Sequence, residues 1–452
     1  MELKNKKVLV AGSGKSGIGA ANLLKKVGAV VTIYDGNVKL NKEDILAKLD
    51  NKENVDVILG ELKEDVIKQF DLMILSPGIA IDAPFVNDVR DNNVPIWGEV
   101  ELAYVVGKGR LAAITGTNGK TTTTALVGEI LAAYYKDVNV VGNIGTPYTL
   151  TAFDSTEDTV TVAEISSFQL ETIHTFKPDV SAVLNITPDH LNRHYTMECY
   201  TNVKMSIAKN QDNNQPIVLN YEDPILREYA GKLTNRIIWF SSKQKVNPGV
   251  YLEGKNIIYA DGKKETFVTT TEDTTLVGIH NVENIMAAIG ISVNMGVPDA
   301  VIKEAIKKFK AVAHRIEYVD TIDDVIYYND SKGTNTDASI KAIQAMTRPT
   351  VFIAGGYDKK VTFDEWAKEL DGKVKCLVLL GETSNQIADT AKKYGFENII
   401  FTKSLEEAID ECKKNAQQGD AVLLSPACAS WDMFDSYEQR GDMFKDYVKK
   451  LK

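Results

Sequence analysis

The first hundred residues alternate between short apolar runs and longer amphipathic stretches. Residues 16–28 (SGIGAANLLKKVG) have helical spacing and end on a glycine, whereas the apolar runs around them have the length of buried strands. Strands that are apolar throughout and separated by helices are typical of a parallel sheet covered on both faces. The turn residues of 91–99 (DNNVPIWGE) end this pattern, so residues 1–96 form the first predicted domain. The strands predicted in it are 7–12 (KVLVAG), 29–35 (AVVTIYD), 55–60 (VDVILG) and 72–78 (LMILSPG).

The rest of the chain repeats this alternation in two further segments. The second, residues 97–312, begins with a strand–loop–helix pattern at 111–131 and becomes polar and strand-rich between 235 and 277, which predicts a small β meander. The third, residues 313–452, alternates strands and helices again. We therefore expect an α/β protein of three domains. The other strands predicted in these segments are 159–167 (TVTVAEISS), 180–188 (VSAVLNITP), 215–220 (QPIVLN), 349–356 (PTVFIAGG), 375–382 (KCLVLLGE), 398–403 (NIIFTK) and 421–427 (AVLLSPA).

The amino-acid composition is typical of a globular protein, and it argues against nucleic acid and membranes as partners. With 452 residues, the expected number of domains is about three. A net charge of −10 argues against nucleic acid as a partner, because phosphate backbones require clustered Lys and Arg. The four cysteines lack CxxC spacing, the N-terminus has no signal-peptide pattern, and no apolar run approaches the roughly 18 residues of a membrane span. We expect a cytoplasmic monomer with reduced thiols and no membrane partner.

Residues 116–121 (GTNGKT) have the pattern of a loop that binds a nucleotide triphosphate. Gly116 and Gly119 allow backbone N–H groups to turn toward phosphate oxygens. Lys120 would reach the β- and γ-phosphates, and the Thr121 hydroxyl would bind Mg²⁺. Ile114 replaces the first glycine of the full G-x-x-x-x-G-K-[ST] pattern, but the strand before the loop and the helix after it match the expected context.

Polar residues follow two of the predicted strands that come after this loop. Glu164 ends one strand, and Asp189 and His190 lie just beyond the next. A lone residue of either kind is more often structural, but ligands bind at the carboxyl edge of open α/β sheets. We therefore predict that these groups converge on the triphosphate, with Glu164 as a ligand of Mg²⁺.

A second glycine-rich loop lies near the N-terminus. Gly12, Gly14 and Gly17 form G-x-G-x-x-G after a strand, and Asp35 ends the next strand about twenty residues later, as in a dinucleotide fingerprint. Taken alone this favours NAD, but a UDP-sugar also carries a diphosphate that suits a helix N-terminus. The sequence LSPGI, ending at Ile79, adds a loop on the same edge. An enzyme that acts on a nucleotide-linked substrate would use both glycine loops.

Nine motifs in register resemble those of the Mur ligases. They are GTNGKTTT, GNIG, EISSFQLE, TPDHLNRH, GIHNVENIMAA, HRIE, NDSKGTN, GGYDKK and SPACASWDMFDSYEQRGDMF, between residues 116 and 444. The N-terminal glycine loop and SPGI extend the resemblance to nearly the whole chain, and the last motif is similar to that of the D-glutamate-adding member. The resemblance implies a Rossmann-like UDP-binding domain, a central ATPase domain with a small β-rich part, and a Rossmann-like C-terminal domain that binds the incoming amino acid.

The resemblance also implies the reaction, its cofactors and its substrates. ATP would convert the carboxylate of UDP-N-acetylmuramoyl-L-alanine into an acyl phosphate, which the amine of D-glutamate attacks. Two Mg²⁺ ions are implied, with Thr121, Glu164, His190 and Lys204 as metal-binding residues. Lys204 would be carbamylated, which turns a cation into an anionic group. The implied catalytic residues are Lys120, Glu164, His190 and Lys204.

Three groups of binding residues follow from the same resemblance. ATP would contact Gly116, Thr117, Asn118, Gly119, Lys120, Thr121, Thr122, Asn281, Asn284, Arg315 and Asp330. The UDP-linked substrate would contact Ser13, Gly14, Lys15, Ser16, Asp35, Gly36, Asn37, Pro77, Gly78, Asn143, Ser166 and His190. The amino acid would contact Lys332, Thr334, Lys359, Ser430 and Tyr437. The sequence departs from the family at Asn37, where an Arg is expected, and at Tyr437, where Phe is expected.

Four alternatives remain open from the sequence. A sister ligase could add another amino acid, and a folylpolyglutamate-type synthetase could share the central motifs, although that type begins with its triphosphate-loop domain. An NAD dehydrogenase with a chance GKT would bind nicotinamide and release no phosphate. A nucleotide switch would hydrolyse ATP slowly without any amino acid.

Overall fold

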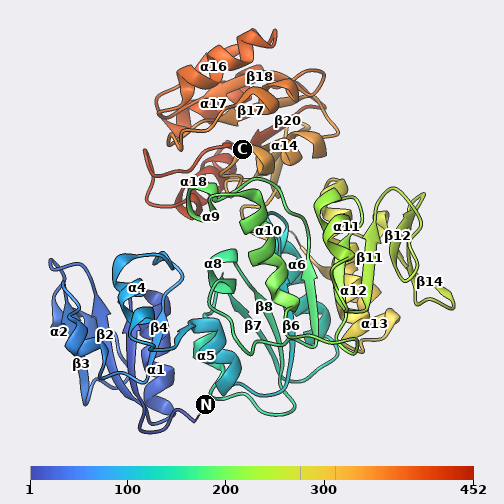
Figure 1. The fold of residues 1–452 in the computed structure, drawn as a ribbon. Helices are drawn as coiled ribbons and strands as arrows, with labels where there is room; N and C mark the ends of the chain where they lie inside the picture. The colour runs from blue at the N-terminus through green and yellow to red at the C-terminus, as the bar shows by residue number, and fades with distance from the viewer. Residues whose placement is uncertain (1, 144, 275, 311, 452) are drawn as a thin grey trace. The chain divides into compact units, whose positions relative to one another are not determined.

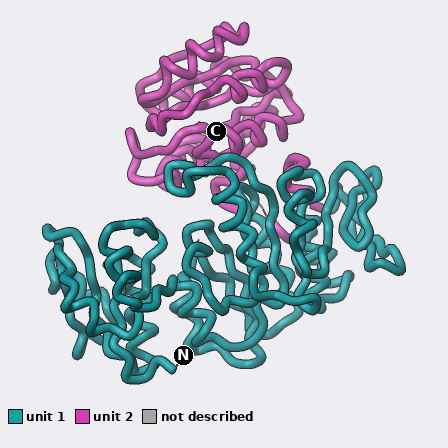
Figure 2. The backbone as a smooth tube through the Cα atoms, in the orientation of Figure 1, with its two compact units in different colours: residues 1–273, 283–307 teal, residues 274–282, 308–452 magenta. Residues whose placement is uncertain are grey.

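The computed structural model describes residues 2–143, 145–274, 276–310 and 312–451, so Ile144 of the GNIG motif lies outside the described residues. Three sheets follow one another along the chain (Figure 1). The chain divides into two compact units (Figure 2). The first unit contains residues 1–273 and 283–307, and the second contains residues 274–282 and 308–452.

The first sheet is entirely parallel, as the apolar runs predict, and has the order β3-β2-β1-β4-β5. The chain order reverses between β1 and β4, so the loops after these two strands leave the same edge of the sheet side by side. Apolar residues on both faces of the sheet are buried under helices. Its strands are β1 (Lys7–Ala11), β2 (Val30–Asp35), β3 (Val55–Leu59), β4 (Leu72–Leu75) and β5 (Ile96–Gly98), and its helices are α1 (Lys15–Lys26), α2 (Lys42–Leu46), α3 (Glu64–Ile67) and α4 (Pro84–Asp91).

The second sheet has the order β14-β13-β12-β11-β10-β9-β6-β8-β7. The pairings from β7 to β12 are parallel, and only the pairs β12–β13 and β13–β14 are antiparallel. This confirms a β-rich part at the place of the predicted meander, although β11 pairs in parallel with β12. The strands are β6 (Arg110–Thr115), β7 (Val138–Gly142), β8 (Val160–Glu164), β9 (Val180–Val183), β10 (Ile217–Asn220), β11 (Ile237–Ser241), β12 (Gly249–Glu253), β13 (Asn256–Ala260) and β14 (Glu265–Thr270).

Helices cover this second sheet and carry several of the predicted motifs. Helix α6 follows β6 after the loop of residues 116–119, and α8 follows β8. Helix α12 belongs to both compact units, because the boundary between them falls at residue 282. The helices are α5 (Glu99–Val106), α6 (Lys120–Ala132), α7 (Tyr148–Thr151), α8 (Ser167–Leu170), α9 (Leu191–His194), α10 (Met197–Met205), α11 (Pro224–Ala230), α12 (Ile279–Asn294) and α13 (Asp299–Lys308), with 3₁₀ turns at Ser206–Ala208 and Thr271–Asp273.

The third sheet has the order β15-β16-β20-β17-β18-β19 and is parallel except for the β15–β16 hairpin. The four strands predicted here are confirmed as β17 to β20, and the hairpin was not predicted. The elements are β15 (Glu317–Ile322), β16 (Val325–Asn329), β17 (Thr350–Ala354), β18 (Val374–Leu379), β19 (Ile399–Phe401), β20 (Ala421–Leu424), α14 (Thr336–Ala345), α15 (Asp364–Lys368), α16 (Ser384–Lys393), α17 (Leu405–Asn415) and α18 (Tyr437–Lys449).

The first two sheets belong to one compact unit, and a common apolar core joins them. One apolar core cluster runs from Leu3 of the first domain to Leu226 of the central domain. Glu101 on α5 is fully buried and accepts hydrogen bonds from the backbone N–H groups of residues 174–176 and from Thr175 Oγ1. The boundaries at residues 96 and 312 stay predictions. Within the described ranges, no helix has both the length and the apolar character needed to cross a bilayer.

Candidate active site

The triphosphate loop, residues 116–119, turns sharply between β6 and α6. Gly116 and Gly119 have φ of 151° and 86°, a region that favours glycine. A Cβ added to Gly119 would lie 2.3 Å from Asn284 Oδ1, and one added to Gly116 would lie 3.0 Å from Leu184 Cβ. Both glycines are therefore required by the backbone and by their neighbours. Asn284, predicted to contact ATP, lies against this loop and also accepts a 3.4 Å hydrogen bond from Thr123 Oγ1.

Asn185, which the sequence analysis missed, holds the triphosphate loop in place. Its carbonyl accepts a hydrogen bond from Thr117 N (2.9 Å), and its Oδ1 accepts one from Asn118 N (2.8 Å). Its Nδ2 donates to Asn118 O (3.0 Å). Asn185 comes two residues after β9, the strand next to β6. Its position just beyond a predicted strand is the feature of the sequence that could have indicated a role at this edge of the sheet.

Lys120 and Lys204 converge on the triphosphate loop. Lys120 Nζ donates to the carbonyls of Gly116 and Thr117, both at 2.9 Å, and Lys204 Nζ donates to the same Gly116 carbonyl at 2.8 Å. Lys204 is only 2% exposed and lies over the Tyr200 ring, 4.8 Å from its centroid. Burial, and then repulsion from the Lys120 ammonium, lowers the pKa of Lys204 well below its ordinary value. This favours the neutral amine, the form of lysine that reacts as a nucleophile.

Glu164 ends β8 beside the triphosphate loop. It is 2% exposed, aligns with Ile114 on β6 and accepts a 3.1 Å hydrogen bond from Asn143 Nδ2. Thr121 is buried in the first turn of α6. The described residues contain no cluster of three or more His, Cys, Asp or Glu side chains that could hold a metal. A buried carboxylate and a hydroxyl beside a phosphate loop nevertheless fit Mg²⁺, which is bound through one or two carboxylates and substrate phosphates.

His190 lies in an irregular segment after β9 rather than in regular structure. Its φ is 52°, its side chain is half exposed, and its Nε2 lies 3.5 Å from Asp189 Oδ2. The Phe168 ring packs against its imidazole with centroids 4.8 Å apart. Ser166, predicted to contact the UDP-linked substrate, begins α8 and exchanges capping hydrogen bonds with Gln169. The structure therefore brings α8, which carries Ser167 to Leu170, together with the His190 segment.

His194, also missed by the sequence analysis, is buried beside this segment. It is 1% exposed, its Nε2 lies 3.0 Å from Ser167 Oγ, and its Nδ1 lies 3.5 Å from Glu171 Oε1. Burial, and then neighbouring positive charges, lower the pKa of His194 to about 4. His194 is therefore neutral in the folded protein at neutral pH.

Acidification should destabilise the protein through His194. The unfolded side chain takes up a proton near pH 6.5 and the folded one only near pH 4, so the free energy of unfolding should fall across this window. We expect the loss to be on the order of 2 kcal/mol. Urea unfolding at several pH values measures it. His194→Gln should flatten the slope, whereas replacing the exposed His174 with Gln should preserve it; an unchanged slope in His194→Gln would contradict this assignment.

The N-terminal glycine loop borders a cavity of about 440 Å³. Ser13 donates to Asp35 Oδ2 through its hydroxyl (2.6 Å) and its N–H (3.1 Å). Burial raises the pKa of Asp35, but hydrogen bonds from Ser13 and Asn37 outweigh it and lower the pKa below its ordinary value. The cavity is lined by Gly12, Ser13, Gly14, Lys15, Ser16, Tyr34, Asp35, Gly36, Asn37, Ser76, Pro77, Gly78, Ile79 and Phe85. Nine residues predicted to contact the UDP-linked substrate thus line one cavity, whereas Asn143, Ser166 and His190 lie on the central sheet.

Two of the residues predicted to contact UDP are hydrogen-bonded to other parts of the protein. Asn37 Oδ1 accepts a 3.0 Å hydrogen bond from Lys39 N, so this side chain closes its own turn where an Arg is expected in the family. Lys15 Nζ donates to Gly145 O (3.1 Å), next to the loop that carries Asn143. Lys15 therefore links the first glycine loop to the central sheet.

Three further predicted ATP residues, Asn281, Arg315 and Asp330, lie in the second unit, whereas Thr122 is buried on α6. Asn281 Nδ2 donates to Val277 O (2.8 Å). Asp330 is buried and accepts hydrogen bonds from Ser425 Oγ (2.6 Å) and from Ile316 N (3.2 Å). Burial raises the pKa of Asp330 to about 6. The positive charge of Arg315 favours the ionised carboxylate and partly offsets this rise in the pKa of Asp330.

The residues predicted to bind the amino acid follow the carboxyl ends of β16, β17 and β20 in the third sheet. Lys332 Nζ lies over the Tyr437 ring, 5.3 Å from its centroid. Lys359 Nζ donates to Thr334 O (3.2 Å) and lies 5.7 Å from the centroid of the Trp431 ring. The adjacent Ser430 is buried. This edge of the sheet therefore presents two ammonium groups among hydroxyl and aromatic side chains.

Arg440, another residue missed by the sequence analysis, is buried beneath this edge. Its Nε donates to Ser331 Oγ (2.9 Å), and its Nη2 donates to the carbonyls of Ser331 (2.8 Å) and Cys428 (3.3 Å). It therefore ties the loop after β16 to the loop after β20.

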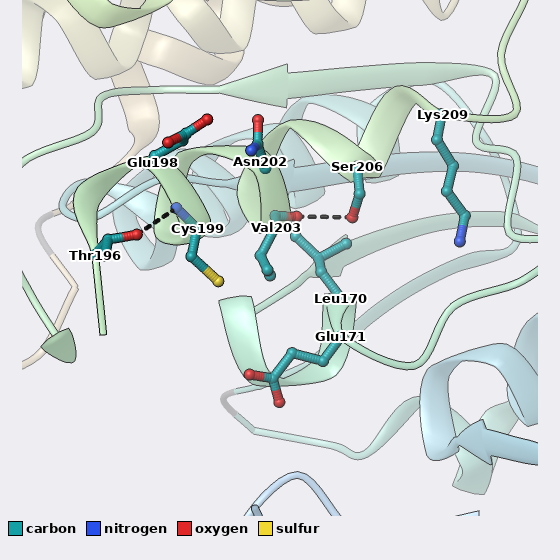
Figure 3. Close-up of a pocket in the computed structure, with 9 residues that line it drawn as sticks. All are labelled: Leu170, Glu171, Thr196, Glu198, Cys199, Asn202, Val203, Ser206 and Lys209. Atoms are coloured by element: carbon teal, nitrogen blue, oxygen red, sulfur yellow. Dashed lines mark hydrogen bonds between the residues drawn. The ribbon is translucent and has the colours of Figure 1, made fainter. Parts of the chain in front are cut away.

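A second cavity, of about 490 Å³, contains none of the predicted site residues (Figure 3). Figure 3 shows Leu170 and Glu171 facing one side of α10, where Thr196 Oγ1 accepts a hydrogen bond from Cys199 N. Its lining residues are Leu170, Glu171, Thr196, Glu198, Cys199, Asn202, Val203, Ser206 and Lys209.

Comparison with protein families divides the chain into three matched regions. Residues 6–98 match the Mur ligase MurD-like N-terminal domain, residues 114–292 the Mur ligase middle domain, and residues 314–428 the Mur ligase glutamate ligase domain. A protein of Lachnospira eligens named UDP-N-acetylmuramoylalanine–D-glutamate ligase is 55% identical over 452 residues, and proteins of the same name from Lachnoclostridium phytofermentans and Clostridioides difficile are 53% and 48% identical. Each alignment covers 100% of both chains.

Solved structures share the fold at low sequence identity. UDP-N-acetylmuramate–alanine ligase MurC from Thermotoga maritima is 20% identical, with a TM-score of 0.60, over 99% of this chain and 100% of its own. MurF ligase from Thermotoga maritima, solved in complex with ADP, is 17% identical, with a TM-score of 0.61, over 100% and 97%. The three matched domains and the full-length relatives establish that the chain belongs to the Mur ligase family.

Proposed function

We propose that the chain is an ATP-dependent ligase that joins D-glutamate to UDP-N-acetylmuramoyl-L-alanine in the synthesis of peptidoglycan precursors. The observation that carries this proposal is 55% identity over the full length of a relative named for this reaction. The geometry agrees, because two phosphate-binding loops follow strands of two different sheets within one compact unit. One loop suits the nucleotide that is consumed, and the other suits the UDP group that the substrate keeps.

The proposed reaction passes through an acyl phosphate. A carboxylate is a poor electrophile, so its oxygen first attacks the γ-phosphorus of ATP and releases ADP. The amine of D-glutamate then attacks the acyl carbon to give a tetrahedral intermediate. Collapse of this intermediate forms the amide and expels phosphate, while the amine gives up a proton. Two anions must meet in the first step, and the Lys120 ammonium beside the triphosphate loop is placed to offset their repulsion.

Mg²⁺ supplies further charge neutralisation on the phosphates when it is bound. Thr121 and Glu164 are the residues proposed to hold one ion, because both are buried beside the triphosphate loop. His190 and a carbamylated Lys204 are proposed for a second ion. Burial lowers the pKa of Lys204 and so favours its neutral amine, which is the form that carbamylation requires.

The other predicted site residues keep their proposed roles. The cavity of the first sheet would hold the UDP group, and Asn143 and Ser166 would contact the rest of that substrate. Asn281, Asn284, Arg315 and Asp330 would contact ATP, and the edge of the third sheet would bind D-glutamate. We further propose that the enzyme is cytoplasmic and monomeric; light scattering at assay concentrations checks the second point.

Phosphate release tests the proposed function directly. With Mg²⁺, ATP and UDP-N-acetylmuramoyl-L-alanine present, D-glutamate should start rapid release, whereas L-glutamate, L-alanine and lysine should leave the background rate unchanged.

Other outcomes would contradict the proposal or favour an alternative. Release with L-glutamate but not D-glutamate would contradict the proposed specificity, and no release with any amino acid would contradict the ligase activity. Release that needs no amino acid would favour a nucleotide switch. In a separate mixture of the protein with NADH, quenching of the nicotinamide fluorescence would favour a dehydrogenase.

A further inference from the structure

The segment from Asp189 to Tyr195, here called the α9 segment, connects the central sheet to the first domain. His190 near its start has φ of 52° and Tyr195 at its end has φ of 64°, and positive φ is uncommon for residues other than glycine. The Tyr195 hydroxyl donates a hydrogen bond to Asp82 of the first domain. The segment therefore spans from a proposed metal-binding residue to a contact with the first domain.

Arg193 makes the main contacts of the α9 segment with the first domain. Its Nη1 donates to Pro77 O at 3.1 Å, and its Nη2 donates to Ile79 O at 2.8 Å. Both acceptors belong to the loop of residues 76–79, which lines the UDP cavity. One guanidinium thus binds two carbonyls of a loop whose strand, β4, belongs to another sheet.

Glu171 and Phe168 also hold the guanidinium of Arg193. Arg193 Nη2 lies 2.5 Å from Glu171 Oε2, and the side chains are only 13% and 7% exposed. The guanidinium carbon lies over the Phe168 ring, 4.4 Å from its centroid, and the same ring contacts His190. A buried ion pair with a stacked guanidinium has little freedom to move, so the position of Arg193 is fixed by α8.

The hydrogen bonds from Arg193 to Pro77 O and Ile79 O fix the orientation of these two carbonyls, and with them the peptide planes of the 76–79 loop. Because the peptide bond between Pro77 and Gly78 is trans, its N–H points opposite to the carbonyl that Arg193 binds. Gly78 lines the cavity, and a Cβ added to it would meet no atom within 4 Å. The Gly78 N–H therefore faces away from Arg193, as a donor to an anion in the cavity would.

We propose that Arg193 is a positioning residue that holds the 76–79 loop so that its backbone binds the diphosphate of the UDP-linked substrate. The inference rests on the proposed function. It adds that the α9 segment links the diphosphate site to the His190 site through one side chain. Arg193 touches neither substrate nor ATP in this role, so its loss should affect the binding of one nucleotide and not of the other.

Calorimetric titration of the full-length protein with UDP alone, without Mg²⁺ or ATP, measures this role. Arg193→Lys should weaken UDP binding about tenfold, and the KM for UDP-N-acetylmuramoyl-L-alanine should rise by the same factor while kcat stays within about twofold. The affinity for a fluorescent ATP analogue should not change. Arg90→Lys is the matched control, because exposed Arg90 donates to Ile81 O in the same part of the chain and should leave UDP binding unchanged.

A second variant separates positioning from general stability. Glu171→Gln removes the charged partner of Arg193, so it should weaken UDP binding by a smaller factor, and the double variant should bind UDP no worse than Arg193→Lys alone. Unchanged UDP affinity in Arg193→Lys would overturn the inference, as would an equal loss of ATP-analogue affinity together with a lower Tm. If the wild-type protein binds no UDP, the proposed function fails and the inference fails with it.

Discussion

Replacing Lys204 with alanine is expected to lower kcat by about 100- to 1000-fold while the protein stays folded. The reason lies in the setting of this side chain: the amine is buried and lies beside the Lys120 ammonium, which favours its neutral form. A neutral amine can attack CO₂, which forms an N–C bond, releases a proton and leaves a carbamate. The variant cannot form this anion and would lose the group proposed to hold the second Mg²⁺. Phosphate release in the complete assay measures the loss.

Chemical rescue distinguishes a missing anion from a damaged fold. Added bicarbonate, formate or acetate should restore part of the activity of Lys204→Ala, because a small carboxylate can enter the space that the side chain leaves. Lys232→Ala is a suitable control, since Lys232 also lies over a tyrosine ring, 5.1 Å from the centroid of Tyr229, but is exposed. It should keep wild-type activity. Near wild-type rates in Lys204→Ala would show that the carbamate role is wrong.

Regular elements with strong patterns were predictable from the sequence. Continuous apolar runs such as 72–75 are typical of strands buried on both faces of a parallel sheet, and this run became β4. The β15–β16 hairpin was missed because its burial is partial and its polar residues, such as Asp320, interrupt the apolar pattern. The parallel pairing of β11 with β12 could not be predicted either, since local sequence does not specify which distant strand becomes a neighbour.

The candidate site was predictable where glycine spacing constrains the backbone. The motif at Gly12 to Gly17 led to the residues that line one cavity, because a close approach of backbone and ligand requires those glycines. The convergence of Lys120 and Lys204 on one carbonyl depends on tertiary packing, so the loop pattern indicated Lys120 and the resemblance indicated Lys204, but neither indicated their shared acceptor. Arg193 stood in the TPDHLNRH motif but was given no role, because the partners of its side chain lie 22 to 116 residues away along the chain.

Replacing Lys120 with methionine is expected to have the other large effect, a loss of about 100- to 1000-fold or more in phosphate release. Methionine keeps much of the length and apolar character of the side chain but removes the ammonium that donates to the triphosphate loop. The change also acts on Lys204, since loss of the neighbouring cation raises the pKa of that amine and removes a charge that stabilises a carbamate. Labelled bicarbonate followed by NMR should therefore show a weaker carbamate signal in the variant.

The two lysine variants should differ in a way that assigns their roles. Bicarbonate should not rescue Lys120→Met, because the missing group is a cation, whereas it should partly rescue Lys204→Ala. UDP binding should be unchanged in Lys120→Met, since the UDP cavity belongs to the first sheet and the triphosphate loop to the second. A variant that keeps phosphate release within tenfold of wild type would contradict the role of Lys120. A parallel loss of UDP affinity would show instead that the substitution disturbs the whole first unit, because no single charge in the triphosphate loop should act on both nucleotides.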